Sequence, residues 1–354
     1  MRKLFSIALM CYFSAGTLCA CTTFFINKNG QFAFGRNYDW LTDAGMVCSN
    51  LRGLAKTSMK MPEGSVVNCK SKYRSITFNQ YGKEFPNGGM NDMGLVVEMM
   101  WLDGSQYPKA DKRPSMYVLQ WIQYQLDNCS TIDELIATDK SVRIASKGTA
   151  PLHYLAADAS GNAATIEFFE GKMTVHKGKD LPFAVLTNDN YSSSVKYASA
   201  LAGTSNASRS FTTNSLDRFA TACNMVKSFN EKRSGSIIDH SFNILNTVAQ
   251  GSHTKWSIVY DITNRKISFK TLGYPQVKNV DFSAFNFNCA TSSKAWDMNQ
   301  AVTGDIAGLF ADFSLDLNSK IVNRSFDEST SEFVVGEAGR KQTWEYAGSI
   351  SCKN

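Results

Sequence analysis

Several features that would assign a chain quickly to a class are missing from this sequence. Only seven of its 354 residues are Pro, and neither Pro nor Gly clusters into a linker, which favours one large domain. No run of about 18 apolar residues follows residue 20, as a membrane-spanning helix would need. Basic residues never occur five in a row, and the formal charge of +6 is spread thinly, which makes nucleic acid a poor candidate partner.

Histidine is also scarce, with four residues in the whole chain. We expect His153, at the start of an apolar stretch, to be a buried structural residue, and His176 and His240 to be exposed in polar surroundings. His253 is a weaker candidate for lining a pocket. No Cys forms a CxxC or CxxH pattern, so we expect no zinc site, no other metal and no cofactor. With no His needed, a Cys–His protease mechanism loses its main support.

The first twenty residues have the pattern of an export signal. Arg2 and Lys3 supply a basic start, residues 4–18 are mostly apolar, and Cys19-Ala20 ends the segment with small side chains. We therefore expect an exported protein, periplasmic or secreted, in which removal of residues 1–20 leaves Cys21 as the N-terminus. Loss of Arg2 and Lys3 lowers the formal charge of +6 to about +4.

The same junction permits a second interpretation. Leu18-Cys19-Ala20-Cys21 approximates a bacterial lipobox, in which the new N-terminal Cys is acylated on its sulfur and on its amine. Such a protein would be a lipid-tethered binding protein without catalysis, because both reactive groups of Cys21 would be consumed. A lipoprotein usually continues into a flexible polar tether, whereas here a strand pattern begins directly after Cys21. The sequence therefore favours the catalytic alternative.

The mature chain would contain seven Cys, an odd number. Up to three disulfides can form in an exported protein, and Cys21 would be the thiol left over. Pairing cannot be read from the sequence, although Cys48 and Cys69 are the one close pair, and several of the six could equally be buried free thiols. The six are Cys48, Cys69, Cys129, Cys223, Cys289 and Cys352.

A predicted β-hairpin begins at Cys21. Residues 21–26 and 31–36 are rich in Thr, Phe and Ile, and Asn29-Gly30 between them is a strong turn signal. An antiparallel pair folded about this turn brings Arg36 and Asp39 back to the start of the first strand. Both side chains are then expected within reach of Cys21.

This arrangement suits a thiol nucleophile. Only the thiolate attacks well, and the guanidinium of Arg36 should lower the thiol pKa from its ordinary value of about 8.5. A free α-amino group, with a pKa of roughly 7.7–8, can take the thiol proton, and Asp39 can hold that amine. The alternative is that Arg36 and Asp39 form a structural ion pair at a strand end.

These residues and four later motifs resemble the choloylglycine hydrolase family, the linear-amide hydrolases that include bile salt hydrolases and penicillin V acylases. The order and approximate spacing of the motifs also fit, and the resemblance covers most of residues 21–275. The matching segments are Cys21-Thr22, GRNYDW (35–40), MNDMGLV (90–96), APLH (150–153), LTN (186–188) and LDRF (216–219).

The resemblance implies an α+β fold, the four-layer αββα sandwich of N-terminal-nucleophile hydrolases. It implies that Cys21 is the nucleophile, with Arg36 and Asp39 as activating and orienting partners. It also implies that Asn188 is an oxyanion donor and Arg218 a supporting charge. Read without the resemblance, Asn188 would cap a turn after the apolar segment 183–186, and Arg218 would be a surface charge on a helix.

One departure from the family pattern bears on the substrate. Trp101 stands where many bile salt hydrolases carry an Asn, so we expect its backbone N–H to be the second oxyanion donor while its indole faces the substrate. An apolar pocket is expected from Trp40, Met99, Trp101 and Tyr191. Conjugated bile salts, penicillin V and other small N-acyl amides are the candidate substrates.

The remaining segments are expected to be scaffold. Residues 116–129 predict a helix, and Thr131 to Glu134 form a capping box that opens the next helix. Strands are predicted over residues 152–157, 163–169 and 172–176, and a hairpin over 255–260 and 266–271. No motif stands out after about residue 276. We expect that stretch to be a variable extension that completes a sheet edge or an oligomer contact.

Overall fold

The computed structural model describes residues 21–201, 214–231, 235–332 and 334–352. The expected export signal, residues 1–20, lies outside the described residues. In the described part of the chain, no helix has both the length and the apolar character needed to cross a bilayer.

The N-terminal hairpin forms as predicted. Strands β1 (Thr22–Lys28) and β2 (Gln31–Asp39) pair antiparallel, with Thr23 opposite Arg36. Asn29 and Gly30 have φ angles of 53° and 76°, and two consecutive positive φ angles are what the commonest two-residue hairpin turn requires. The turn therefore sets the register that returns Arg36 to the beginning of β1.

This hairpin lies inside a seven-stranded sheet. Its strand order is β14-β1-β2-β15-β16-β17-β19, antiparallel except for the last pair, in which β17 and β19 run parallel. The other strands of this sheet are β14 (Val185–Leu186), β15 (Thr254–Asp261), β16 (Lys266–Thr271), β17 (Lys278–Asp281) and β19 (Gly304–Asp305).

A nine-stranded sheet packs against the first one. Its order is β13-β12-β11-β8-β7-β6-β3-β18-β20. Side chains from the two sheets meet in the middle layer: the Phe78 ring lies 6.1 Å from Tyr260 and 5.3 Å from Phe269, centroid to centroid. Its strands are β3 (Met46–Asn50), β6 (Ser75–Asn79), β7 (Pro86–Asn91), β8 (Val96–Trp101), β11 (Leu152–Ala157), β12 (Ala163–Phe169), β13 (Lys172–Lys177), β18 (Lys294–Asp297) and β20 (Ala311–Asp312).

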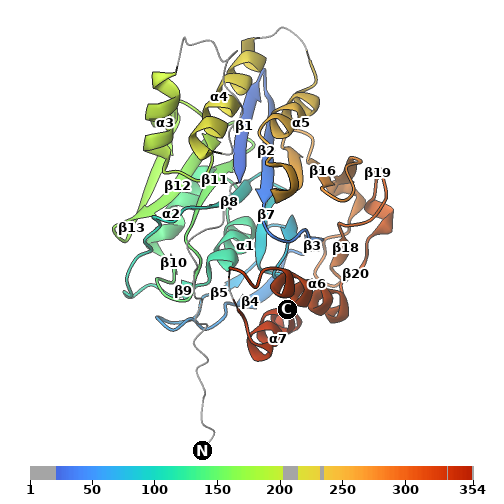
Figure 1. Cartoon of the computed structure of the whole chain (residues 1–354). Coiled ribbons are helices and arrows are strands. Elements are labelled where there is room, and N and C mark those ends of the chain that lie inside the picture. Colours follow the sequence, from blue (N-terminus) through green and yellow to red (C-terminus); the bar gives the residue numbers. More distant parts are fainter. Residues whose placement is uncertain (1–20, 202–213, 232–234, 333, 353–354) are drawn as a thin grey trace, which may run out of the picture.

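Helices cover the outer face of each sheet, which gives the four layers (Figure 1). On the seven-stranded side, α5 receives a hydrogen bond of 2.7 Å from Asn37 of β2 to the Leu245 carbonyl. On the nine-stranded side, α1 receives one of 2.9 Å from Asn91 of β7 to the Leu126 carbonyl. The helices of these layers are α1 (Val118–Asn128), α2 (Ile132–Ala137), α3 (Tyr191–Ala200), α4 (Ser215–Glu231) and α5 (Ile237–Thr247). The αββα prediction is confirmed.

The predicted start of α2 is confirmed with one change in its capping. The hydroxyl of Thr131 accepts a hydrogen bond from the backbone N–H of Glu134, as a capping box requires. The Glu134 carboxylate, however, accepts from the backbone N–H of Ser130 at 2.6 Å, one residue before the cap. These two hydrogen bonds together stabilise the first turn of α2.

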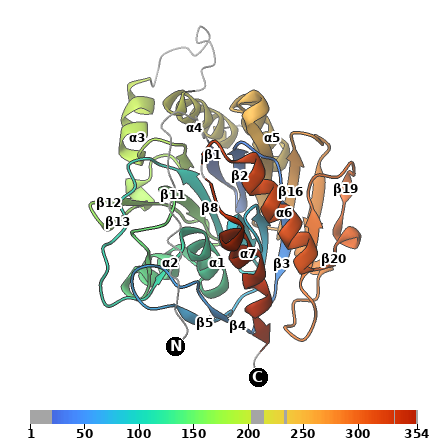
Figure 2. The ribbon, with the colours of Figure 1, turned by 60° about the horizontal axis from the view of Figure 1, so that its bottom comes forward.

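The segment after residue 276 adds edge strands to both large sheets, β17 and β19 to one and β18 and β20 to the other. Completing a sheet edge was one of the two roles expected of it. Figure 2 shows α6 (Leu315–Glu328) and α7 (Glu337–Glu345) side by side in front of the sheets. The smaller sheets are β21-β4-β5, from Ser351–Cys352, Leu54–Thr57 and Asn68–Lys70, and β10-β9, from Arg143–Ile144 and Ser115–Met116.

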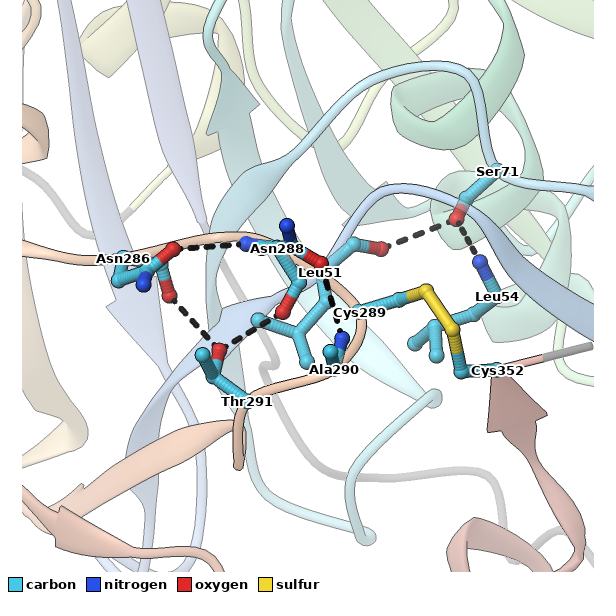
Figure 3. Close-up of a disulfide and its surroundings, with 9 residues drawn as sticks. All are labelled: Leu51, Leu54, Ser71, Asn286, Asn288, Cys289, Ala290, Thr291 and Cys352. Carbon is cyan, nitrogen blue, oxygen red and sulfur yellow. Dashed lines mark hydrogen bonds between the residues drawn. A yellow bond between two sulfur atoms is a disulfide. The ribbon is translucent and has the colours of Figure 1, made fainter. Parts of the chain in front are cut away.

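A disulfide fastens this C-terminal segment to itself. Cys289 and Cys352 are bonded across 63 residues, beside the chain at Leu51 and Leu54 (Figure 3). The close pair in sequence, Cys48 and Cys69, is not bonded. The five described Cys outside the disulfide are Cys21, Cys48, Cys69, Cys129 and Cys223.

Replacing both bonded Cys by Ala should lower the free energy of unfolding by about 2–4 kcal/mol, because the cross-link restricts the unfolded chain. Urea denaturation of the single variants Cys289→Ala and Cys352→Ala and of the double variant measures this. Each single variant should lose nearly as much stability as the double variant, since either one breaks the bond. Clearly additive losses would show that the two side chains stabilise by packing, not through the disulfide.

Candidate active site

The Cys21 thiol lies directly before β1 and is buried, with 3% of the residue exposed. Two groups of β2 lie next to its sulfur. The thiol donates to the carbonyl oxygen of Asp39, 3.9 Å from the sulfur, and Arg36 Nη2 lies 3.9 Å from the same sulfur. The hairpin thus brings together the three residues that the sequence grouped.

The Arg36 guanidinium is fully buried between the two sheets. Besides Cys21, it donates to the carbonyl oxygens of Asn87 and Met99, each at 3.0 Å, and its Nη1 forms an ion pair with Glu98. Burial disfavours the charged guanidinium, yet Glu98, Cys21 and neighbouring groups outweigh this and raise the pKa of Arg36. Arg36 therefore stays charged.

The pKa of the Cys21 thiol corrects one sequence-based expectation. Arg36 does lower this pKa, as expected, but burial raises it by more, so the net change is upward. The Asp39 carboxylate adds to the upward shift. The thiol is therefore protonated near neutral pH in this geometry and needs a base to take its proton.

Asp39 is buried at the end of β2. Its Oδ2 accepts a hydrogen bond of 2.8 Å from Gln250 Nε2, while Oδ1 has no hydrogen-bond partner among the described residues. Burial raises the pKa of Asp39, against the lowering effect of Arg218 and of hydrogen bonds from Thr254 and Gln250. One carboxylate oxygen thus remains available as an acceptor close to Cys21.

Arg218 lies on α4 and is buried, so it is not the surface charge that its helical position alone suggested. Its Nη1 donates to the Cys21 carbonyl and to the Thr22 hydroxyl, each at 2.6 Å. Its Nη2 donates to Asn188 Oδ1 at 3.0 Å. This guanidinium links the residue before β1 to the loop that follows β14.

Asn188 is held from three sides. Its backbone N–H donates to the Ser215 hydroxyl at 2.9 Å, and Arg218 holds its side-chain oxygen. Its Nδ2 donates to the Trp101 carbonyl at 2.9 Å. An amide nitrogen carries two hydrogens, so one donor remains after the Trp101 bond. The orientation of the Asn188 side chain is therefore determined by contacts, not by a turn.

Two of the four expected pocket residues form an aromatic pair. The rings of Trp40 and Trp101 lie 6.1 Å apart, centroid to centroid. Trp40 Nε1 donates to the Tyr81 hydroxyl at 2.8 Å, and Trp101 Nε1 donates to Asp103. The Trp40 indole is thus fixed directly after β2, and the Trp101 indole is fixed at the end of β8.

Met99 is placed differently from the expectation. It lies directly opposite Tyr154 of β11, and residues opposite one another in antiparallel strands point to the same face of a sheet. Tyr154 packs on Trp121 of α1, with the rings 4.6 Å apart, so this is the helix-covered face. Met99 contributes its backbone carbonyl to Arg36, and its side chain belongs to the scaffold.

Tyr191 is the second correction to the expected pocket. It begins α3 and is 1% exposed. Its hydroxyl donates to the Phe183 carbonyl at 2.7 Å, and its ring lies 4.8 Å from His176 and 6.1 Å from Phe219. These are contacts within the helix and sheet core, so Tyr191 positions α3 and does not line the pocket.

Of the three burial predictions made for His, one is confirmed and two are wrong. His153 is buried as predicted, between the Thr187 carbonyl at 2.7 Å and the Glu167 carboxylate at 3.2 Å. His176 and His240 are half-buried, not exposed, because each meets a ring, Tyr191 and Phe229 respectively. His153 thereby supports the residue that precedes Asn188.

Sequence reasoning did not single out Glu98, Gln250 or Tyr81. Glu98 had one usable signal, since it is the sole charged residue in the apolar strand VVEMMW. Gln250 and Tyr81 lie 211 and 41 residues from the side chains they contact, and nothing local marks either of them. Within the described ranges, no group of three or more His, Cys, Asp or Glu side chains is placed to hold a metal ion.

The C-terminal segment also approaches this region. The Tyr81 hydroxyl, which accepts from Trp40, lies 3.4 Å from the Ser329 hydroxyl just after α6. The Tyr81 ring packs on Phe326 of α6, with centroids 5.1 Å apart. α6 therefore supports the residue that holds the Trp40 indole.

The four-layer αββα fold is that of the N-terminal-nucleophile hydrolases. Comparison with known proteins identifies the family. Residues 21–227, more than half of the chain, match the linear amide C-N hydrolases, choloylglycine hydrolase family. The chain belongs to this family, as the sequence motifs indicated.

Individual relatives agree with this assignment. A penicillin V acylase from Pectobacterium atrosepticum is 28% identical over an alignment of 260 residues, and the match covers 61% of this chain and 68% of the relative. The structure of a penicillin V acylase from Agrobacterium tumefaciens has a TM-score of 0.74 at 24% identity, covering 83% of this chain and 98% of its own. A variant of conjugated bile acid hydrolase from Clostridium perfringens has a TM-score of 0.67 at 18% identity, covering 80% of this chain and 98% of its own. At these identities the two structures show a shared fold.

Arg218→Lys should lower the rate of amide hydrolysis by up to about 10²-fold, the loss that a misplacement of about 1 Å can cause. A lysine offers one point charge and cannot bridge the Cys21 carbonyl, Thr22 and Asn188 at once. Arg113→Lys, at an ion pair with Asp111 and Asp139, is the matched control and should leave the rate unchanged. Equal rates in Arg218→Lys and wild type would show that the bridge is dispensable.

Proposed function

We propose that removal of residues 1–20 exposes Cys21 as the N-terminal nucleophile of a hydrolase that cleaves small N-acyl amides through a thioester. This proposal rests on the contacts of one buried residue. Arg36 and the Asp39 carbonyl both lie against the Cys21 thiol, and Arg218 binds the Cys21 carbonyl. Membership of a linear amide hydrolase family supports it. The protein is proposed to act after export, in the periplasm or outside the cell, and to need no cofactor or metal.

The first step is deprotonation of the thiol. Because burial raises the thiol pKa, Arg36 alone does not generate the thiolate. The α-amino group of processed Cys21 has an ordinary pKa of roughly 7.7–8 and accepts the proton. Asp39 Oδ1 is an acceptor without a partner among the described residues and can bind the resulting ammonium.

The sulfur then attacks the amide carbonyl carbon and forms a tetrahedral intermediate. Its oxyanion is stabilised by the second Nδ2 hydrogen of Asn188, with the backbone N–H of Trp101 as the partner donor. The ammonium returns its proton to the leaving nitrogen, the C–N bond breaks, and an acyl thioester remains on Cys21. Water, deprotonated by the same amine, then attacks the thioester carbon, the C–S bond breaks to release the acid, and the ammonium returns its proton to the Cys21 sulfur.

The acyl group is proposed to bind against the Trp40 and Trp101 indoles. Two fixed aromatic faces favour an apolar acyl group, aromatic or steroid. The named activities of the relatives, a penicillin V acylase and a conjugated bile acid hydrolase, belong to the same class of small N-acyl amides. We therefore propose penicillin V-like and conjugated bile salt substrates, and neither a nucleic acid nor a protein as the substrate.

A second candidate follows from the Leu18-Cys19-Ala20-Cys21 segment, namely a lipid-anchored binding protein acylated at Cys21. The position of the thiol argues for the enzyme instead. The sulfur is buried and faces Arg36 and the Asp39 carbonyl, so an acyl-glyceryl group on it would have to displace both.

Intact-mass measurement of the mature protein separates the two candidates. We expect a chain that begins at an unmodified Cys21, whereas a mass raised by three acyl chains would support the lipoprotein. Cys21→Ala should remain folded by circular dichroism and lose all turnover. Cys21→Ser should lose nearly all turnover, because a hydroxyl stays protonated near neutral pH. Turnover within a few fold of wild type in Cys21→Ala would reject Cys21 as the nucleophile.

The Trp101 and Asn188 side chains should affect catalysis in different ways. Asn188→Ala should lower turnover of every substrate by roughly 10²–10³, the usual loss for one oxyanion donor. Trp101→Ala keeps its backbone N–H and should instead change the ratio of kcat/KM between penicillin V and a glycine-conjugated bile salt. A uniform loss from Trp101→Ala, with unchanged preference, would place its indole outside the acyl site.

A further inference from the structure

Glu98 is a buried carboxylate that the proposed reaction does not use. It lies in the middle of β8 and is fully buried between the two sheets. Its Oε2 forms the ion pair with Arg36 Nη1, and its Oε1 accepts a hydrogen bond from the Tyr260 hydroxyl on β15. The described contacts therefore satisfy both carboxylate oxygens with side chains of the seven-stranded sheet.

The neighbouring strand leaves space for this carboxylate. Gly88 of β7 lies directly opposite Glu98, and a Cβ at Gly88 would stand 2.0 Å from Glu98 Oε2 and 2.1 Å from its Cδ. Gly88 does not have the positive φ that would itself call for glycine. The missing side chain at position 88 thus makes room for Glu98, and the two residues form one feature of the site.

Arg36 is shared between two acids. Its Nη1 faces Glu98 and its Nη2 faces Cys21, so one positive charge serves a carboxylate and a thiol. If both acids ionise, the buried group of three carries a net negative charge, which burial disfavours. Ionisation of Glu98 therefore opposes ionisation of Cys21, and the two acids titrate as a coupled system.

The other groups around Glu98 agree with this coupling. Burial raises the pKa of Glu98 to about 7, with Arg36 and Tyr260 acting in the lowering direction. Burial also raises the pKa of Tyr260, so its hydroxyl remains a donor. The Tyr38 ring lies 4.7 Å from the Arg36 guanidinium and also favours its charged form. Arg36 and Tyr260 are the titratable side chains that contact Glu98 in the described structure.

We propose that Glu98 is a positioning residue that holds Arg36 beside Cys21 and partly neutralises its charge, so that Cys21 keeps its proton until the α-amine removes it. When Glu98 is ionised, the thiolate receives only part of the guanidinium charge. When Glu98 is protonated, Arg36 acts on the thiolate alone. This inference rests on the proposed function for its biological meaning, and its test measures the thiol directly.

The test is the pH dependence of Cys21 alkylation by iodoacetamide in the processed enzyme. Glu98→Gln preserves shape and can still accept from Arg36 and donate to Tyr260, but it removes the negative charge. The alkylation midpoint should fall by about one pH unit, because an opposing charge next to the shared cation is lost. Tyr260→Phe removes a hydrogen bond that stabilises the ionised form of Glu98. It should therefore lower the alkylation midpoint of Cys21 in the same direction but by a smaller amount.

The control is Glu63→Gln, which removes a carboxylate that contacts Arg143 and Lys147 and should not move the midpoint. A double-mutant cycle tests the route of the effect. In an Arg36→Gln background, Glu98→Gln should cause no further fall, since a buried Glu98 that has lost its cation stays protonated and carries no charge to remove. A role in positioning Arg36 alone would raise the midpoint in Glu98→Gln, because Arg36 would then act less on the thiolate, so the direction of the shift separates the two roles.

An unchanged midpoint in folded Glu98→Gln, or an equal fall with and without Arg36, would overturn the proposal. If Glu98→Gln does not fold, an unshifted midpoint in Tyr260→Phe decides against it in the same way. The pH profile of kcat/KM provides a second measurement, in which the acid limb of Glu98→Gln should move to lower pH. If Cys21→Ala retained turnover while the alkylation midpoint still shifted, the proposed function would fail and the coupling of Glu98 to Cys21 would stand.

Discussion

A positive charge buried between two β-sheets, that of Arg36, is the constraint on which the site depends. Moving a guanidinium out of water is expensive unless its donors are satisfied and its charge is paired. Here two backbone carbonyls, the Glu98 carboxylate and the Cys21 sulfur surround it. Three of these partners come from the opposite sheet, so the two sheets must pack in one register for the charge to be tolerated.

A second buried guanidinium, that of Arg218, extends the same principle to the helix layer. It joins the Cys21 carbonyl and the Thr22 hydroxyl to the Asn188 side chain, and so ties α4, β1 and the loop after β14 together. Asn188 in turn holds the Trp101 carbonyl at the end of β8. The proposed nucleophile, the proposed oxyanion donor and the proposed acyl surface are therefore positioned by one connected set of hydrogen bonds.

The C-terminal segment does more than complete the edges of the two sheets. Beyond residue 276 it extends both sheets, is closed by the Cys289–Cys352 disulfide, and brings Phe326 and Ser329 against Tyr81. Tyr81 accepts the hydrogen bond of the Trp40 indole. The family match ends at residue 227, so this support for Trp40 comes from outside the matched region.

The sequence by itself determined the hairpin and the neighbours of Cys21, because a two-residue turn with Asn29 and Gly30 sets the pairing of strands that are adjacent in the chain. Motifs spread along the chain were enough to predict the family and its four layers. Contacts between segments far apart in sequence decided the rest. They set the face on which Met99 lies, the burial of Tyr191 and Arg218, and the pairing of Glu98 with Arg36. The net pKa of the Cys21 thiol belongs to the same group, since burial, which only the packed structure sets, outweighs the local effect of Arg36.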